Sequence, residues 1–134
     1  MITAVDTSVL VDVFVADPAF GPRSQGALAA CLAEGRVVAS EIVWAELAAV
    51  FPSATTAQAA MDRLGVDFEP LDRVAALAAG DAWRAYKRRG GRRDRVIADF
   101  LIGAHAAARA DRLLTRDRGF YRTYFTRLKV LDPA

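Results

Sequence analysis

The chain has 134 residues, of which 54% are hydrophobic, so it is the size of one domain with its own buried core. Its single cysteine, Cys31, excludes an intramolecular disulfide framework and a cysteine-rich zinc site, and a reducing cytoplasmic setting fits best. The net charge is only +2, and the apolar runs are broken by charges before the ~18 residues needed to span a bilayer, so we expect no membrane partner.

In the first half of the chain, short apolar segments alternate with segments of helical periodicity. Residues 2–5 predict a strand, and the following Val9, Leu10, Val13 and Phe14 have helical spacing. Next come a helix over about residues 24–34, a strand at 37–39, a helix from Ser40 to about residue 51 and a helix over 57–64. Gly35 and Gly65 follow two of these helices, and we expect Gly35 to be a left-handed cap.

The second half continues the same alternation. Residues 66–71 predict a strand and about 71–89 a long helix that Gly90 and Gly91 interrupt. A further helix is predicted over 94–110, a short strand at 113–114, an aromatic loop around 120–125 and a last strand at 128–131. Such alternation predicts an α/β fold whose parallel sheet is covered on both faces. The functional crevice of such sheets lies beyond the carboxyl ends of the strands.

Two aspartates directly follow predicted strands. Asp6 comes after the first strand and Asp117 after the strand at 113–114, so both belong to the expected crevice. Each also has a simpler interpretation: Asp6 caps the next helix, and Asp117 belongs to a turn. Together they are harder to explain by local structure than either is alone.

Glu46 lies inside an apolar stripe of its predicted helix, with Ile42, Val43, Ala49 and Val50 on neighbouring turns. We therefore expect Glu46 to be buried, where a carboxylate needs a metal, a proton or a cation, because an unpaired buried charge costs several kcal/mol. A buried salt bridge to an arginine is the alternative.

Asp99 lies at the edge of the apolar stripe of the helix at 94–110. An ion pair with Arg95, four residues earlier, explains it equally well. Asp6, Glu46, Asp99 and Asp117 are thus candidates for one acidic site. Oxygen ligands of this kind suit Mg²⁺ or Mn²⁺. His105 lies six residues beyond Asp99, on another side of an ideal helix, and we interpret it as structural.

Three blocks of the sequence match a known family. They are AVDTSVLVDVF from Ala4, SEIVWAEL from Ser40 and ADFLIGAHAAARADRLLTRDRGFY from Ala98. In this order and spacing, they resemble PIN-domain ribonucleases, specifically the VapC-type toxins of bacterial toxin–antitoxin pairs, over essentially the full length.

The resemblance implies a PIN-like three-layer α/β/α sandwich, with a central, mainly parallel sheet of four to five short strands, as a single domain over residues 1–134. It also implies that Asp6, Glu46, Asp99 and Asp117 are catalytic and metal-binding, supported by the hydroxyls of Thr7, Ser8 and Thr115. The motif favours Asp99 over the nearby Asp94. The implied activity is Mg²⁺-dependent cleavage of tRNA or rRNA that inhibits translation. The implied partners are a VapB-type antitoxin and a second copy of the chain.

A cluster of basic residues precedes the helix of Asp99. Lys87, Arg88, Arg89, Arg92 and Arg93 could contact RNA phosphates, or could simply favour the dipole at the end of a helix. Tyr121, Tyr124 and Phe125 could stack on bases, but an aromatic loop packed on the core is favoured. Trp44 and Trp83 are interpreted as core or interface residues.

Two other functions compete with the nuclease. One is a non-catalytic PIN-like module that binds RNA or protein, which has no need of four acids. The other is an aspartyl-phosphate domain, which also places an aspartate after its first strand. Phosphatases of that class need a second aspartate two residues later, where this chain has Ser8.

Overall fold

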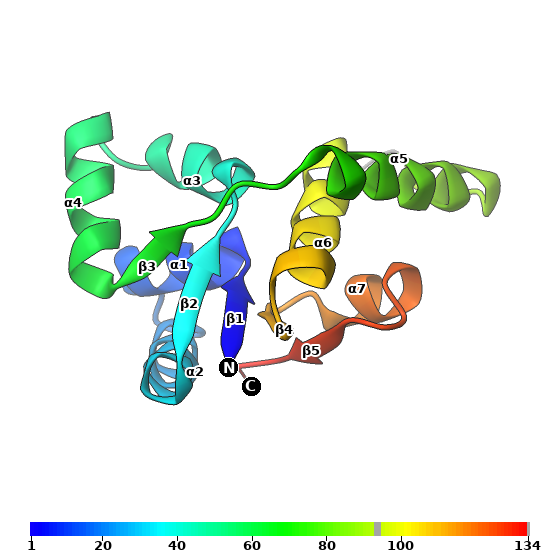
Figure 1. Ribbon diagram of the computed structural model, residues 1–134. Helices are drawn as coiled ribbons and strands as arrows, with labels where there is room; N and C mark the ends of the chain where they lie inside the picture. The colour runs from blue at the N-terminus through cyan, green and yellow to red at the C-terminus, as the bar shows by residue number, and fades with distance from the viewer. Residues whose placement is uncertain (93–94, 134) are drawn as a thin grey trace.

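Figure 1 shows the computed structural model of the chain, which describes residues 1–92 and 95–133. Strands and helices alternate along most of its length. The strands are β1 (Ile2–Val5), β2 (Arg36–Ala39), β3 (Val66–Phe68), β4 (Arg112–Leu114) and β5 (Lys129–Leu131). The helices are α1 (Thr7–Phe14), α2 (Gly21–Glu34), α3 (Glu41–Ala48), α4 (Ala54–Leu64), α5 (Arg73–Arg88), α6 (Ile97–Arg109) and α7 (Arg118–Tyr124).

The five strands form one parallel sheet in the order β3-β2-β1-β4-β5, which confirms the predicted α/β fold. Ala4 in the central strand pairs with Val38 on one side and Leu113 on the other. Connections between parallel strands are right-handed, so α1–α4 cover one face and, after the strand order reverses, α5–α7 cover the other (Figure 1). The reversal brings the carboxyl ends of β1 and β4 together, and ligands bind at such a switch point.

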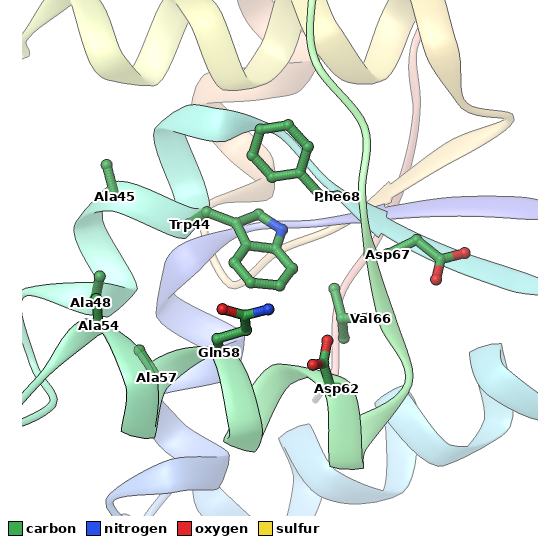
Figure 2. Close-up of a pocket in the computed structure, with 10 residues that line it drawn as sticks. All are labelled: Trp44, Ala45, Ala48, Ala54, Ala57, Gln58, Asp62, Val66, Asp67 and Phe68. Carbon is green, nitrogen blue, oxygen red and sulfur yellow. The ribbon is translucent and has the colours of Figure 1, made fainter.

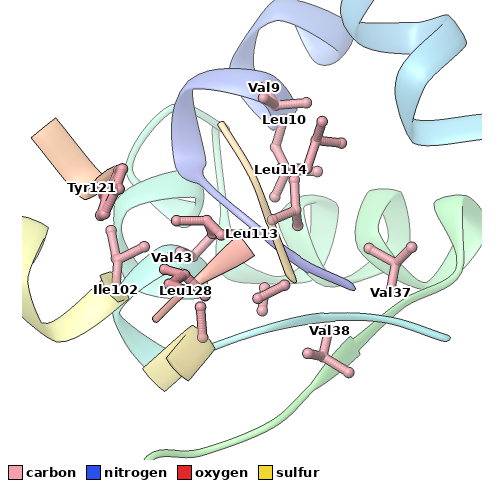
Figure 3. Close-up of a cluster of buried hydrophobic side chains, with 14 of the residues drawn as sticks. Val9, Leu10, Val37, Val38, Val43, Ile102, Leu113, Leu114, Tyr121 and Leu128 are labelled. Carbon is pink, nitrogen blue, oxygen red and sulfur yellow. The ribbon is translucent and has the colours of Figure 1, made fainter. Parts of the chain in front are cut away.

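Helices on both faces explain why most residues of the central strands are buried. Adjacent residues of a strand point to opposite faces, yet Val37 and Val38 are both buried. Figure 3 shows Leu113 and Leu114 of β4 packed among side chains from α1, α3 and α6, including Leu10, so the switch point is anchored in the core. Among the described residues, no helix is long and apolar enough to cross a membrane.

Three local predictions need correction. Gly35 is extended (φ 159°, ψ −149°) rather than left-handed, and a side chain there would collide with the backbone of Met1. Gly65, with φ 88°, is the left-handed cap. The aromatic segment expected as a loop forms α7, and the helix beginning after Ser40 ends at Ala48 instead of near residue 51.

Candidate active site

A pocket of about 460 Å³ lies at the carboxyl ends of β1 and β4, and acidic side chains dominate its lining. The lining residues are Asp6, Thr7, Ser8, Glu46, Asp99, Ile102, Arg116 and Asp117. The pocket therefore brings together all four acids selected from the sequence. They come from four different segments: the turn after β1, helix α3, the first turn of α6 and the turn after β4.

Asp6 is the most buried of the four acids, with 8% of its surface exposed. It caps α1, because one carboxylate oxygen accepts the Thr7 N–H at 2.8 Å, while the other accepts the Thr115 hydroxyl at 2.7 Å. Asp6 is thus both the helix cap and a wall of the pocket. Burial raises the pKa of Asp6 to about 6 against the effect of these two donors, and the charges of Asp99 and Glu46 add to the rise.

Glu46 is exposed, contrary to the buried position expected from its apolar neighbours. The residues around it explain the error: Ala49 and Val50 lie beyond the end of α3 and are also exposed, so the stripe is not a buried face. A buried salt bridge is therefore wrong as well. The Glu46 carboxylate accepts the Thr7 hydroxyl at 2.8 Å, which ties α3 to the first turn of α1.

Arg95 connects the two remaining acids. Its guanidinium lies 2.5 Å from a carboxylate oxygen of Asp117 and 3.9 Å from one of Asp99, and it stacks on the ring of Phe120 at 4.1 Å. The Arg95–Asp99 pair considered from the sequence therefore exists, although Asp99 also borders the pocket. Burial opposes the charge on Arg95, but the hydrogen bond and negative charge of Asp117 raise the pKa of the guanidinium.

The predicted supporting hydroxyls have three different environments. Thr7 and Thr115 donate to Glu46 and Asp6, and Thr115 also accepts the backbone N–H of Asp117 at 3.0 Å. The hydroxyl of Ser8 is buried at the pocket and has no hydrogen-bond partner among the described residues. A buried hydroxyl in this condition favours an additional ligand or water nearby.

The donor set fits a hard divalent cation, because the acids and hydroxyls around the pocket supply only oxygen ligands. Within residues 1–92 and 95–133, however, no three acidic, histidine or cysteine side chains are grouped closely enough to hold an ion as they stand. Asp6, Glu46 and Asp117 are hydrogen-bonded to other groups of the chain, namely Thr115, Thr7 and Arg95.

Sequence reasoning missed Arg116 and its partner Asp12. Arg116 borders the pocket but pairs with Asp12, which lies in the core and was not singled out. Tyr121, with 1% exposure, packs in the core as favoured from the sequence. Its pKa is raised by burial and then by the charges of Asp6, Asp99 and Asp117, so its phenol lies close to the acids. No local pattern signals the pair of Arg116 and Asp12, because 104 residues separate them.

His105 is structural, as predicted. Only 2% of its surface is exposed, and its Nε2 lies 2.6 Å from the carbonyl oxygen of Glu69, which fastens α6 to the segment after β3. Burial lowers the pKa of His105 and favours the neutral ring. Histidine therefore contributes nothing to the acidic pocket.

The basic cluster begins at the end of α5. Lys87 and Arg88 occupy the last turn of that helix, and both are exposed together with Arg89 and Arg92. The structure thus agrees with the dipole interpretation for Lys87 and Arg88 while leaving all four side chains accessible to phosphate. Arg93 and Asp94 lie outside the described residues. Trp83 is half-buried against Phe100, and the Lys87 ammonium lies 3.8 Å from the centre of the Trp83 ring.

A larger cavity of about 550 Å³ lies elsewhere, between α3, α4 and β3 (Figure 2). Trp44, several alanines and Phe68 give it apolar walls, and the rings of Trp44 and Phe68 pack edge to face. Its two acids, Asp62 and Asp67, are accompanied by no hydroxyl residue. This cavity suits apolar contact rather than metal chemistry.

The sequence matches the family model of the PIN domain over residues 3–126. The chain belongs to the PIN domain family. No curated protein matches it.

Among solved structures, this PIN domain is similar to a chain of VapBC2 from Rickettsia felis bound to a promoter DNA fragment, with a TM-score of 0.76, 20% identity and 98% of each chain covered. It is also similar to VapBC-1 from nontypeable Haemophilus influenzae, with a TM-score of 0.74, 22% identity, and 99% and 98% of the two chains covered. FitAcB from Neisseria gonorrhoeae gives a TM-score of 0.69 at 23% identity, with 99% and 98% covered. At these identities the likeness demonstrates a shared fold.

Proposed function

We propose that this PIN domain is a Mg²⁺-dependent endoribonuclease, with Mn²⁺ as a possible substitute, and that it is the toxin of a VapBC-type pair. Its substrate would be tRNA or rRNA, whose cleavage inhibits translation. The convergence of Asp6, Glu46, Asp99 and Asp117 on one pocket carries the proposal. The shared fold with chains of VapBC and FitAcB complexes supports the toxin assignment.

Each group of the pocket has a place in this reaction. When bound, one or two Mg²⁺ ions would supply positive charge for the phosphate and lower the pKa of the attacking water. The four acids would hold them, with Asp6 oriented by the Thr115 hydroxyl and Glu46 by that of Thr7. Ser8, whose hydroxyl has no partner among the described residues, would complete the oxygen ligands or bind a water.

RNA needs positive surface beside an acidic pocket. Lys87, Arg88, Arg89 and Arg92 offer it, since all four are exposed on the segment leading to α6, which carries Asp99. We include Arg93 among the proposed phosphate contacts only because it is next to Arg92 in the sequence. Such contacts bind the RNA backbone without reading its sequence, and their strength falls with salt.

Two apolar surfaces suit the proposed protein partners, a VapB-type antitoxin and a second copy of the chain. One is the cavity between α3, α4 and β3, where Phe68 is 54% exposed. The other is on α5, where Val74 and Leu77 lie one turn apart and are largely exposed. Burial against another chain would remove such apolar area from water.

Incubation of the purified chain with total cellular RNA tests the activity. Discrete fragments should form with Mg²⁺ or Mn²⁺ and disappear with EDTA. Asp99→Asn removes one ligand charge with little change of shape and should abolish cleavage. Asp81→Asn is the matched control, because Asp81 pairs with Arg84 on an exposed part of α5.

The outcomes separate the nuclease from its alternative, a non-catalytic PIN-like module that binds RNA or protein. RNA binding without metal-dependent fragments from the folded chain would favour the module. Equal cleavage by Asp99→Asn and the wild type would remove Asp99 from the site. Mapping the fragment ends would identify the RNA and the sequence cut.

A further inference from the structure

Two arginines lie near the acids of the pocket, and they have different partners. Arg95 binds the pocket acids Asp117 and Asp99. Arg116 lines the pocket itself, yet it binds Asp12 instead: Nε lies 2.8 Å from one carboxylate oxygen and a terminal nitrogen 3.1 Å from the other. This fork satisfies both oxygens of Asp12, an arrangement that gives geometric specificity as well as energy.

Asp12 is held firmly in place. Its side chain is 3% exposed, and the hydroxyl of Ser24, on α2, donates to it at 2.8 Å. A carboxylate in this position requires a cation, since an uncompensated buried charge costs several kcal/mol. Arg116 supplies the charge, and the ring of Phe20 covers its guanidinium at 4.1 Å. The side chain of Arg116 is thus fixed on the α1–α2 side of the pocket.

The Arg116–Asp12 pair matters for the pocket because Arg116 lies next to pocket residues in the chain. Arg116 lies between Thr115, which binds Asp6, and Asp117 in the chain, and it lines the same pocket as the four acids. An arginine fork matches any carboxylate, and four acids border the same pocket. Without Asp12, Arg116 would be drawn to those acids and would compete with a cation for their oxygens.

We infer that Asp12 is a positioning residue that holds Arg116 away from the four acids and so keeps the pocket available to a divalent cation. The inference rests on the proposed function, because it concerns the same site. Asp12 acts through Arg116 alone and touches neither the cation nor the RNA.

Mn²⁺ binding to the full chain, measured by calorimetry without RNA, tests the inference. Asp12→Asn removes the charge, keeps the shape and releases Arg116, so the dissociation constant for Mn²⁺ should rise about tenfold, as expected for one extra positive charge near the ion. Adding Arg116→Met to the Asp12→Asn chain removes the positive charge that Asp12→Asn releases. The dissociation constant of this double variant for Mn²⁺ should therefore be within about threefold of the wild-type value.

A second substitution covers the case in which Asp12→Asn does not fold. Arg116→Lys keeps a positive charge beside Asp12 but loses the two-point hydrogen bonding of the guanidinium, so the charge is held less firmly. The Mn²⁺ affinity of this variant should lie between that of the wild type and that expected for Asp12→Asn. Circular dichroism confirms folding of each variant, and Asp81→Asn controls for the loss of a negative charge elsewhere.

Recovery of Mn²⁺ affinity in the double variant distinguishes a positioning role of Asp12 from a role in folding alone. Unchanged affinity in folded Asp12→Asn would overturn the inference, and so would a loss of affinity that the double variant does not restore. If Asp12→Asn does not fold, wild-type affinity in Arg116→Lys overturns it. Absence of Mn²⁺ binding by the wild type would overturn the proposed function and the inference together. Mn²⁺ binding with the expected rescue, but without RNA cleavage, would contradict the nuclease alone.

Discussion

The guanidinium of Arg95 lies 2.5 Å from a carboxylate oxygen of Asp117, so one cation of the chain already lies against the acids of the pocket. Under the proposed function Asp117 would bind a divalent ion, and the guanidinium would compete with that ion for the carboxylate. The stacking of Arg95 on Phe120 shows where the side chain is supported on its other side.

Arg95→Met should therefore tighten Mn²⁺ binding several-fold, because it removes the competing charge while keeping a similar length of apolar side chain. Calorimetric titration at fixed salt measures the effect. Arg84→Met, at an exposed pair on α5, is the control. Weaker binding in Arg95→Met would mean that the guanidinium supports the site rather than competing for it.

Stability of the chain in EDTA should depend on pH through Asp6. Its pKa is about 6 in the folded chain against an ordinary 3.8, so folding favours the protonated acid. This contribution to the free energy of unfolding is fully present below pH 3.8 and is lost as the pH rises through 6, a change of roughly 3 kcal/mol.

Asp6→Asn should remove that dependence and stabilise the chain at pH 7. Urea unfolding of both proteins between pH 4 and pH 7 gives the difference in the free energy of unfolding, which should grow with pH in favour of the variant. A difference that stays constant over this range would contradict the burial of a charged Asp6.

Gly103→Ala should destabilise the fold by about 1–3 kcal/mol, the range for overpacking. A Cβ at residue 103 would overlap the ring of Phe125, which packs α6 against the end of α7. Gly80→Ala is the matched substitution in α5, where a Cβ meets nothing within 4 Å, and it should stabilise by about 0.5–1 kcal/mol. Thermal unfolding measures both. Equal effects at the two positions would contradict the close approach at Gly103.

Replacing Lys87, Arg88, Arg89 and Arg92 by alanine should weaken RNA binding and make it less dependent on salt. Each lost phosphate contact lowers the slope of log K against log salt by about 1. Binding of a labelled RNA to Asp99→Asn between about 50 and 200 mM salt measures the slope. Arg84→Ala tests whether any loss of positive charge on α5 does the same. An unchanged slope would mean that these basic residues do not contact RNA and only interact with the dipole at the end of α5.

The sequence was sufficient for the order of the strands and of every helix except α7, and for the edge of the sheet at which Asp6 and Asp117 meet. Short apolar strands, and polar residues where the strands end, are local patterns that can be read from the sequence. In a parallel sheet the carboxyl ends of the strands lie at one edge, so these polar residues come together there. The burial of Glu46 was predicted wrongly because helical periodicity describes a face without saying whether another element covers it. Ala49 and Val50, which completed the stripe, lie past the end of α3 and are exposed.

The long-range ion pairs, unlike that of Arg95 with Asp99, could not be predicted, for a different reason. Arg95 meets Asp117 across 22 residues and Arg116 meets Asp12 across 104, and each arginine had closer acids in the sequence. Which acid a long, flexible side chain binds depends on the packed positions of several elements. The resemblance to a family helped with the acids and said nothing of these arginines.

The pairing of β1 with β4 also determines when the pocket can exist. Thr115 and Asp6, whose hydrogen bond joins the two strand ends, are 109 residues apart. Contacts of such long range form late, and a chain emerging from the ribosome exposes β1 long before β4. A translation product that stops before β4 would carry Asp6, Glu46 and Asp99 without Thr115 or Asp117. Under the proposed function, an unfinished chain would therefore lack part of the nuclease site.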